Sequence, residues 1–210
     1  MLSKTKLSPK EIRIEDFDYS LPEERIAKFP LEQRDQSKLL LYKSGGIGHA
    51  HFRSLPEHLP AGAMLVFNDT KVIHARLHFT LENGTRIEIL CLEPLAPHDY
   101  QQNFSSTAPV RWKCLIGGNR KWKSGVVEKE LKGGRVERLI LTAKRIQRLE
   151  DAFEVEFSWN DENLAFGELL AQAGIIPLPP YLNREHVASD EERYQTIYAR
   201  EQGSVAAPTA

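Results

Sequence analysis

The sequence predicts an α/β (α+β) base domain interrupted by an inserted antiparallel, β-barrel-like domain. The central observation is that residues 86–93, 110–116 and 152–159 look like strands, and the last of them alternates apolar with polar side chains. A period of two gives a strand one buried and one wet face, as in an antiparallel sheet or small barrel. Helical and short apolar patterns flank this region. We therefore expect a base formed by residues 1–76 and 161–210, and an insert formed by residues 77–160.

The part before the insert predicts one helix and two strands. Ser20 and Glu23 have the spacing of a capping box, which places Ile26 and Phe29 toward the core until Pro30 ends the helix. Residues 38–42 form a short apolar run that ends at a Gly-Gly turn. Residues 63–67 form another apolar run, which predicts a buried strand.

The part after the insert predicts two helices around an extended segment. Residues 166–173 carry apolar side chains at i, i+3, i+4 and i+7, and Gly174 is placed as the C′ residue of that helix. Residues 177–181 contain three prolines and must be extended. Residues 189–192 repeat the capping-box pattern, which predicts a short helix that continues to Tyr198.

The charge is unevenly distributed. The net charge of −1 argues against a uniformly basic nucleic-acid-binding protein, yet residues 111–148 hold 12 Lys/Arg against three acidic residues, a net charge of +9. This block falls inside the predicted insert. It fits either a positively charged lobe that binds phosphate backbones or a solvated, lysine-rich face.

Composition excludes several other classes. Hydrophobic residues make up 41% and charged residues 27%, as in soluble globular proteins. No apolar run reaches the roughly 18 residues of a membrane helix, and the first 15 residues lack the apolar core of a secretory signal. We therefore expect a cytoplasmic protein. Cys91 and Cys114 lie in strand-like runs, which predicts two buried thiols and no disulfide.

Neither a metal site nor a nucleotide-binding loop is predicted. The seven histidines are scattered, and neither cysteine has a partner at ligand spacing. The glycine-rich stretch at residues 45–48 matches no phosphate-binding or dinucleotide fingerprint and opens no helix. A Rossmann-type methyltransferase is therefore not supported.

Three polar segments could carry chemistry, and each has an alternative explanation. Asp69 follows the predicted strand at residues 63–67, where it could bind ribose hydroxyls, act as a base, or cap a turn. Tyr194 and Tyr198 would share a helix face, where they could stack on a base or pack the core. Residues 203–210 are small, which suits close approach to a ligand or a tight turn.

These segments occur together in a recognisable order. The blocks are Phe17-Asp18-Tyr19-x-Leu21-Pro22 with Ile26-Ala27-x-x-Pro30-Leu31-Glu32-x-Arg34-Asp35, then residues 65–77 (LVFNDTKVIHARL), 177–181 (PLPPY), 192–199 (ERYQTIYA) and 203–210 (GSVAAPTA). Together they resemble the S-adenosylmethionine:tRNA ribosyltransferase-isomerase family of queuosine biosynthesis, over nearly the whole chain.

The resemblance implies a two-lobed fold, an α/β domain with a β-barrel, which agrees with the expectation from strand patterns. It also implies a reaction. The ribosyl part of S-adenosylmethionine would be transferred to 7-aminomethyl-7-deazaguanine in a tRNA anticodon and isomerised, giving epoxyqueuosine with release of adenine and methionine. S-adenosylmethionine would be a co-substrate, tRNA the partner, and no cofactor or metal would be held permanently.

The implied reaction assigns hypothetical roles to motif residues. Asp69 is the candidate base or ribose anchor, and Arg76 or Arg193 would hold a carboxylate or phosphate. Aromatic side chains would stack on adenine or the target base. The full set expected to contact S-adenosylmethionine or the base is Asn68, Thr70, Tyr181, Tyr194, Thr196, Tyr198, Ser204 and Thr209.

The family chain continues past Ala210 with a Gly-Leu-His-Phe-Thr-like segment, so this chain resembles the N-terminal part of the family chain, either as a truncated piece or as a naturally short protein. Two other functions stay open. One is a non-catalytic RNA-binding module, and the other is an S-adenosylmethionine enzyme that acts on a small molecule. Binding through several phosphates weakens steeply with salt, whereas small-molecule binding changes much less.

Overall fold

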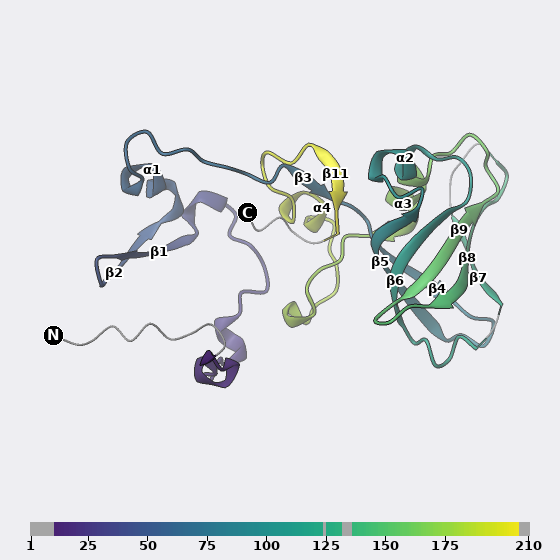
Figure 1. Ribbon diagram of the computed structural model, residues 1–210, viewed down its shortest axis with the longest axis horizontal. Helices are drawn as coiled ribbons and strands as arrows, with labels where there is room; N and C mark the ends of the chain where they lie inside the picture. The colour runs from purple at the N-terminus through teal and green to yellow at the C-terminus, as the bar shows by residue number, and fades with distance from the viewer. Residues whose placement is uncertain (1–10, 124, 132–135, 206–210) are drawn as a thin grey trace. The chain divides into compact units, whose positions relative to one another are not determined.

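A computed structural model describes residues 11–123, 125–131 and 136–205. The chain forms two compact units, Met1–Arg53 and Ser54–Ala210. Figure 1 shows the first unit in purple and blue and the second from blue through green to yellow.

The first unit is built around a β-hairpin. Strands β1 (Lys38–Lys43) and β2 (Gly46–His51) pair antiparallel, with Leu41 opposite Gly48. Ser44 and Gly45 connect them with φ values of +52° and +84°, the left-handed backbone that a tight two-residue hairpin requires. The strand predicted at residues 38–42 is thereby confirmed. The remaining elements are short 3-10 turns: η2 (Ile14–Phe17), η3 (Glu23–Arg25), η4 (Arg34–Gln36) and η5 (Phe52–Ser54).

The helix predicted from Ser20 is wrong. Only the three-residue turn η3 forms there, its N-cap is Pro22, and Phe29 is 58% exposed instead of facing a core. Pro22 and Pro30 leave room for about two helical turns, and an isolated helix of that length is unstable without an apolar partner face.

The second unit centres on a curled sheet of seven strands. Its order is β10-β4-β5-β6-β9-β8-β7, and every neighbouring pair is antiparallel. In this order β4 is the second strand and β7 is the last. The sheet nevertheless curls enough to bring Cα atoms of these two strands within 8 Å of each other. The strands are β4 (Arg76–Thr80), β5 (Arg86–Ala96), β6 (Val110–Gly117), β7 (Val126–Leu131), β8 (Leu139–Arg148), β9 (Phe153–Trp159) and β10 (Gly174–Ile175).

This sheet confirms the predicted antiparallel, curled β-rich region, and it contains the basic block. The structure does not show that the sheet is inserted into a base domain, so the boundaries at 76/77 and 160/161 remain a prediction. The sheet also takes in Gly174–Ile175, which pairs with Leu77 and Arg76 at its edge.

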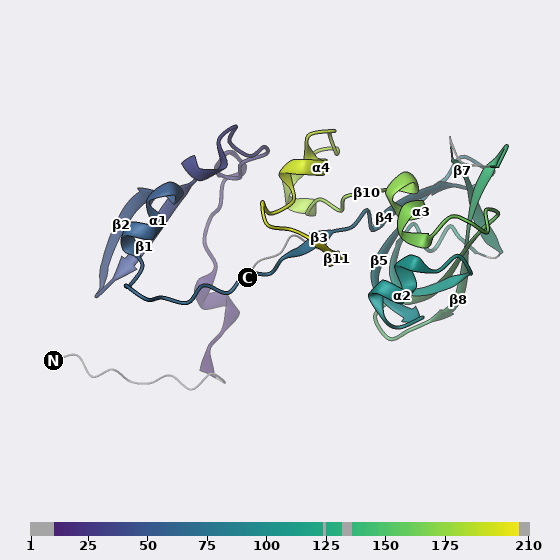
Figure 2. The ribbon, with the colours of Figure 1, turned by 90° about the horizontal axis from the view of Figure 1, so that it is seen from above.

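The core lies inside the curl, under two helices. Helix α2 (Tyr100–Ser105) and helix α3 (Phe166–Ala173) lie side by side against the sheet (Figure 2). Aromatic rings join the layers, because Trp112 of β6 lies between Phe104 of α2 and Phe166 of α3, with centroids 5.8 and 6.0 Å away. Each fully buried large side chain contributes about 1.5–3 kcal/mol. The predicted helix at residues 166–173 is confirmed, and alternation in β9 again marks its buried face.

Gly174 ends α3 for a steric reason. Its φ of −100° is extended, so it is not the left-handed C′ glycine that the sequence suggests. A Cβ at this position would lie 2.0 Å from the carbonyl oxygen of His74 and 3.0 Å from that of Leu170. Only a residue without a side chain lets the chain pass from α3 into β10 at this point.

We expect Gly174→Ala to destabilise the second unit by about 2–3 kcal/mol, because backbone must shift to admit the methyl group. All three tryptophans lie in this unit, so urea unfolding followed by tryptophan fluorescence reports on it. An unchanged midpoint would contradict the close passage of the chain at His74.

The two cysteines are free, buried and directly opposite each other on β5 and β6, as the prediction of buried thiols requires. Burial raises the pKa of the Cys114 thiol well above its usual value, and its contact with Cys91 acts in the same direction. We expect iodoacetamide at pH 8 to label neither thiol in the folded protein and both in urea. Fast labelling without urea would contradict their burial.

Outside the large sheet the second unit contains short elements. Strands β3 (Thr70–Val72) and β11 (Glu201–Ser204) pair in parallel. The helical turns are α1 (Leu55–His58), η6 (Pro180–Leu182) and α4 (Asp190–Arg193).

Candidate functional site

A groove of about 590 Å³ runs along the outer face of β4 and β5. Leu77 and Phe79 of β4 point into the core, so the alternate side chains of this strand point outward into the groove. The opposite wall is the proline-rich segment after β10. The lining residues are Arg76, His78, Arg86, Glu88, Ile175, Ile176, Leu178, Pro179, Pro180, Asn183, Arg184, Glu185 and His186.

The strand wall of the groove is charged. Glu88 lies opposite His78 in the antiparallel register, with 3.2 Å between Glu88 Oε2 and His78 Nε2. Glu88 Oε1 also lies 3.6 Å from Arg76 Nε, while Arg76 Nη2 donates to the carbonyl of Leu178 across the groove at 3.4 Å. The side chain of Arg86 makes no ion pair within the described part of the chain. The strand wall thus carries two guanidinium groups and one carboxylate, and Glu185 of the facing wall adds a second carboxylate, so the donors suited to an anionic ligand group lie on the strand wall.

The opposite wall is extended, as its prolines predict. Ile176 and Leu178 are buried and anchor it to the unit. Pro179 precedes the turn η6, which ends at Asn183 in the left-handed region with φ of +46°. This bend is followed directly by Arg184, Glu185 and His186, which continue the groove wall.

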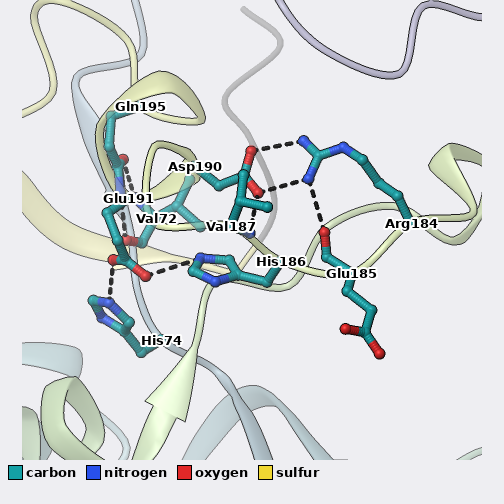
Figure 3. Close-up of polar contacts among 9 residues, drawn as sticks. All are labelled: Val72, His74, Arg184, Glu185, His186, Val187, Asp190, Glu191 and Gln195. Atoms are coloured by element: carbon teal, nitrogen blue, oxygen red, sulfur yellow. Dashed lines mark hydrogen bonds and ion pairs between the residues drawn. The ribbon is translucent and has the colours of Figure 1, made fainter.

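A polar network fixes the chain that follows (Figure 3). Arg184 donates two hydrogen bonds of 2.7 Å to the buried carboxylate of Asp190, which also accepts from the Val187 N–H at 2.9 Å. The hydrogen bond from Arg184 lowers the pKa of Asp190, although burial opposes the shift. The same bond raises the pKa of Arg184.

The network also holds this segment to the chain around β3. Glu191 lies between two histidines, with Oε2 2.5 Å from His74 Nε2 and Oε1 2.9 Å from His186 Nε2. Gln195 accepts from the Val72 N–H at 2.8 Å and donates to the Val72 carbonyl at 2.9 Å. His186 therefore belongs both to the groove and to this network, which positions the groove wall (Figure 3).

The Asn68-Asp69-Thr70 turn is capped by Asn68. Its side-chain oxygen accepts from the Thr70 N–H at 3.0 Å and from the Thr70 hydroxyl at 2.7 Å. Asp69 contributes its carbonyl, which accepts from the Arg200 N–H at 2.7 Å. Its exposed carboxylate makes no hydrogen bond or ion pair with any other described residue. Turn capping is therefore not the role of the Asp69 side chain.

The buried strand predicted at residues 63–67 is wrong. The chain there is extended but pairs with no strand among the described residues, and Met64, Val66 and Phe67 are 88%, 80% and 58% exposed. An apolar run becomes a buried strand only where other strands pair with it and cover it. The ring of Phe67 lies 4.9 Å from that of Tyr198.

The helix predicted to continue to Tyr198 is also wrong. Helix α4 ends at Arg193, Ser189 makes no side-chain cap, and the chain then turns. Beyond Arg193, the side chain of Gln195 exchanges two hydrogen bonds with the backbone of Val72, a distant contact that the helical pattern does not include. Tyr194 and Tyr198 therefore do not share a helix face.

The other residues expected in a site are spread over several elements. Tyr181 lies in η6 and is 64% exposed, and Thr196 is partly buried beyond α4. Ser204 ends β11, where its carbonyl accepts from the Ile73 N–H at 2.9 Å. Thr209 lies outside the described residues. The structure brings Arg76 into the groove and gathers Asn68, Asp69 and Ser204 around β3.

The groove contains side chains that reasoning from the sequence missed. His78 and Glu88 are single positions in separate strands, and only the register of β4 with β5 brings them together. Arg184 of the groove wall binds Asp190, the first residue of α4, six residues further along the chain and after the bend at Asn183. His78 and Glu88 alternate with the buried apolar residues of their strands, and this alternation is the one local sequence signal that could have identified them.

The described residues hold neither a metal-ligand cluster nor a membrane-spanning helix. No group of three or more His, Cys, Asp and Glu side chains in this part of the chain is placed to hold a metal ion. None of its helices combines the length and apolar character needed to cross a bilayer.

The fold and site define a mixed α/β protein that carries an arginine-lined groove on a curled antiparallel sheet. The chain belongs to the queuosine biosynthesis protein family, whose model matches residues 14–210.

Relatives named S-adenosylmethionine:tRNA ribosyltransferase-isomerase share 37–40% of its residues. The relative from Pelobacter propionicus is 39% identical over 200 residues, 94% of this chain and 52% of its own length. The relative from Aquifex aeolicus is 40% identical over 201 residues, 95% of this chain and 53% of its own length. The chain thus spans about half the length of the curated relatives it matches. No solved structure matches it.

Proposed function

We propose that this chain carries out, or forms the N-terminal half of the protein that carries out, transfer and isomerisation of the ribosyl part of S-adenosylmethionine onto 7-aminomethyl-7-deazaguanine in tRNA. The products are epoxyqueuosine in tRNA, adenine and methionine. The relatives' shared name supports the substrates and the class of reaction.

The observation that carries the proposal is the convergence of motif blocks far apart in the sequence. Arg76, in the second block, donates to Leu178 of the third. Val72, also in the second block, exchanges two hydrogen bonds with Gln195 of the fourth, and the Ile73 N–H bonds to Ser204 of the fifth. The parts of these four blocks that the structure describes therefore form one region beside the groove.

The reaction demands fit polar groups in this region. The sulfonium charge acidifies the adjacent carbon, so a base must remove a proton there. Asp69 is an exposed carboxylate that directly precedes β3, and Glu201 of β11, opposite Thr70, is another. Arg76 and Arg86 offer guanidinium donors to a carboxylate or phosphate at the groove. Tyr181 exposes its ring at the groove's edge, where it can stack on a base. Arg193, Tyr194, Thr196 and Tyr198 remain candidates for holding S-adenosylmethionine.

The test is to incubate the chain with S-adenosylmethionine and tRNA that bears the aminomethyl-deazaguanine base, then measure adenine release and the mass of the nucleoside. The full-length Aquifex aeolicus relative serves as a positive control for the substrates. Adenine and methionine release with a matching mass gain on tRNA is the expected result. Turnover by the control but not by this chain would show that these 210 residues do not suffice.

A further inference from the structure

Some cations of the basic block already have a partner in the structure, and others are exposed without an ion pair or hydrogen bond to another described residue. Arg111, Lys113 and Arg138 each lie within 3.4 Å of a carboxylate, and Lys129 donates to the Ala173 carbonyl at the end of α3. Arg145 is held between aromatic rings, and Lys132 and Arg135 lie outside the described residues. The side chains without an ion pair or hydrogen bond to another described residue are exposed: Arg120, Lys121, Lys123, Lys144 and Arg148.

Three of these cations sit on one turn. Residues 117–125 join β6 to β7 and contain Arg120, Lys121 and Lys123 but no acidic residue. Lys144 of β8 lies opposite Val126, where the turn enters β7. We call Arg120, Lys121, Lys123 and Lys144 the basic turn. Glu156, which pairs with Lys144 in the register, is already bound to Arg111 at 2.9 Å.

The basic turn is built on a fixed base. Trp122 lies between its cations in the sequence and is only 1% exposed, so it anchors the turn in the core. The guanidinium carbon of Arg145 lies 5.5 Å from the centre of the Trp122 ring, and Arg145 donates to the Asn119 side chain and to the Lys123 carbonyl. Cation–π contact and hydrogen bonds thus hold Asn119, Trp122 and Lys123 in place.

The basic turn borders the groove. Gly117 pairs with Glu88 in the register of β5 with β6. At Gly118, which has φ of +78°, a Cβ would lie 3.1 Å from the Arg86 carbonyl oxygen. The turn therefore starts against the two β5 residues that line the groove, and Arg86 extends the row of cations toward it.

We propose that the basic turn binds phosphates of the tRNA backbone and holds the RNA beside the groove. The inference rests on the proposed function for the identity of the RNA. Unpaired cations on a fixed turn suit phosphates. Trp122 is buried and cannot stack on a base, so the contact does not depend on sequence.

The test compares two triple variants with the same change in net charge. Arg120→Gln/Lys121→Gln/Lys123→Gln removes the cations of the turn, and Arg111→Gln/Lys113→Gln/Arg138→Gln removes cations that already have carboxylate partners. Binding of an unmodified tRNA transcript is measured by fluorescence anisotropy from 50 to 300 mM KCl. Circular dichroism and tryptophan fluorescence establish that both variants fold.

The turn variant should bind about tenfold or more weakly at 0.1 M salt, and the slope of log K against log salt should fall in magnitude by about 2–3. The control variant should bind within about twofold of wild type. For an RNA duplex of unrelated sequence, the turn variant should show the same decrease in the slope of log K against log salt. Equal loss in both variants, wild-type binding by the turn variant, or no binding by wild type would overturn the proposal.

Adenine release separates this inference from the proposed function. Selective loss of tRNA binding in the turn variant, with adenine release by the full-length relative but by none of the 210-residue proteins, would sustain the surface and show that these residues do not suffice for the reaction. Wild-type tRNA affinity in the turn variant, with normal adenine release, would support the reaction and overturn the proposal that the basic turn binds tRNA. Competition by poly-L-glutamate as strong as that by tRNA at equal charge would assign the turn to an acidic protein and overturn the RNA proposal.

Discussion

Replacing Arg184 with Met is expected to lower the free energy of unfolding of the second unit by about 3–5 kcal/mol. Asp190 is 3% exposed and receives two 2.7 Å hydrogen bonds from this guanidinium. Removal of Arg184 leaves a buried carboxylate with a single bond from the Val187 N–H. The methionine preserves the aliphatic packing, so the loss reports on the ion pair.

Urea unfolding followed by tryptophan fluorescence measures this loss. Arg138→Met is the matched control, because its ion pair to Glu130 joins two side chains that are 67% and 54% exposed, and such pairs contribute about 0–1 kcal/mol. The double variant Arg184→Met/Asp190→Asn should lose less free energy of unfolding than the two single variants together, because it leaves no unpaired charge in the buried site. A loss below 1 kcal/mol for Arg184→Met would show that the pair does not hold the segment.

The same pair predicts a pH dependence. The hydrogen bond from Arg184 keeps the pKa of Asp190 below its usual value of 3.8. The folded state therefore binds fewer protons than the unfolded state in acid, so the contribution is complete above about pH 4 and is lost as pH falls through the lowered pKa. In Arg184→Met, burial without the guanidinium should raise the pKa of Asp190, and mild acid should then restore stability. Urea midpoints measured between pH 3 and 7 should decrease toward acid in the wild type and increase in mild acid in Arg184→Met.

Local signals predicted the elements that depend on local packing. The alternation at residues 152–159 matches β9, and the i, i+3, i+4, i+7 pattern at residues 166–173 matches α3. In both, one face meets a core that neighbouring strands and helices complete, so the pattern and the burial agree. The hairpin at residues 38–51 has no buried face, and its local signal is instead the turn, where Gly45 supplies the left-handed backbone.

Local signals failed where a distant contact decides the conformation. The capping-box spacing at residues 189–192 was real, but Asp190 is bound by Arg184 and Gln195 by Val72, 123 residues earlier. The apolar run at residues 63–67 had no strand among the described residues to cover it. A pattern read over a few residues carries no information about such partners, which is why these two predictions were wrong.

The candidate site was predictable in part. The motif order indicated segments that the structure brings together, and Arg76 of these segments lies in the groove. The groove itself depends on the register of β4 with β5 and on a bend at Asn183, neither of which the sequence specifies. The net charge of residues 111–148 was also visible, but only the structure separates Arg111, which is neutralised, from Lys121, which is not.

Replacing Asp69 with Asn is expected to lower turnover by about 10²–10⁴-fold if this carboxylate removes the proton beside the sulfonium. The amide keeps the size of the side chain but cannot accept a proton. The fold should not change, because the carboxylate is exposed and makes no hydrogen bond or ion pair with another described residue, while Asn68 caps the turn. Turnover is measured as adenine release under saturating S-adenosylmethionine and tRNA.

Asp151→Asn is the matched control, since it makes the same chemical change at an exposed turn of the sheet, where its partner is Lys113. Its turnover should stay within about twofold of wild type. S-adenosylmethionine affinity then separates the two roles open to Asp69. If Asp69→Asn lowers turnover without changing the affinity for S-adenosylmethionine, the carboxylate removes the proton. If the variant binds S-adenosylmethionine more weakly but keeps its turnover at saturation, the carboxylate is a ribose anchor. Normal turnover and normal affinity in Asp69→Asn would remove this residue from the site and leave the groove around Arg76 to supply the base, with Glu88 as the carboxylate already placed there.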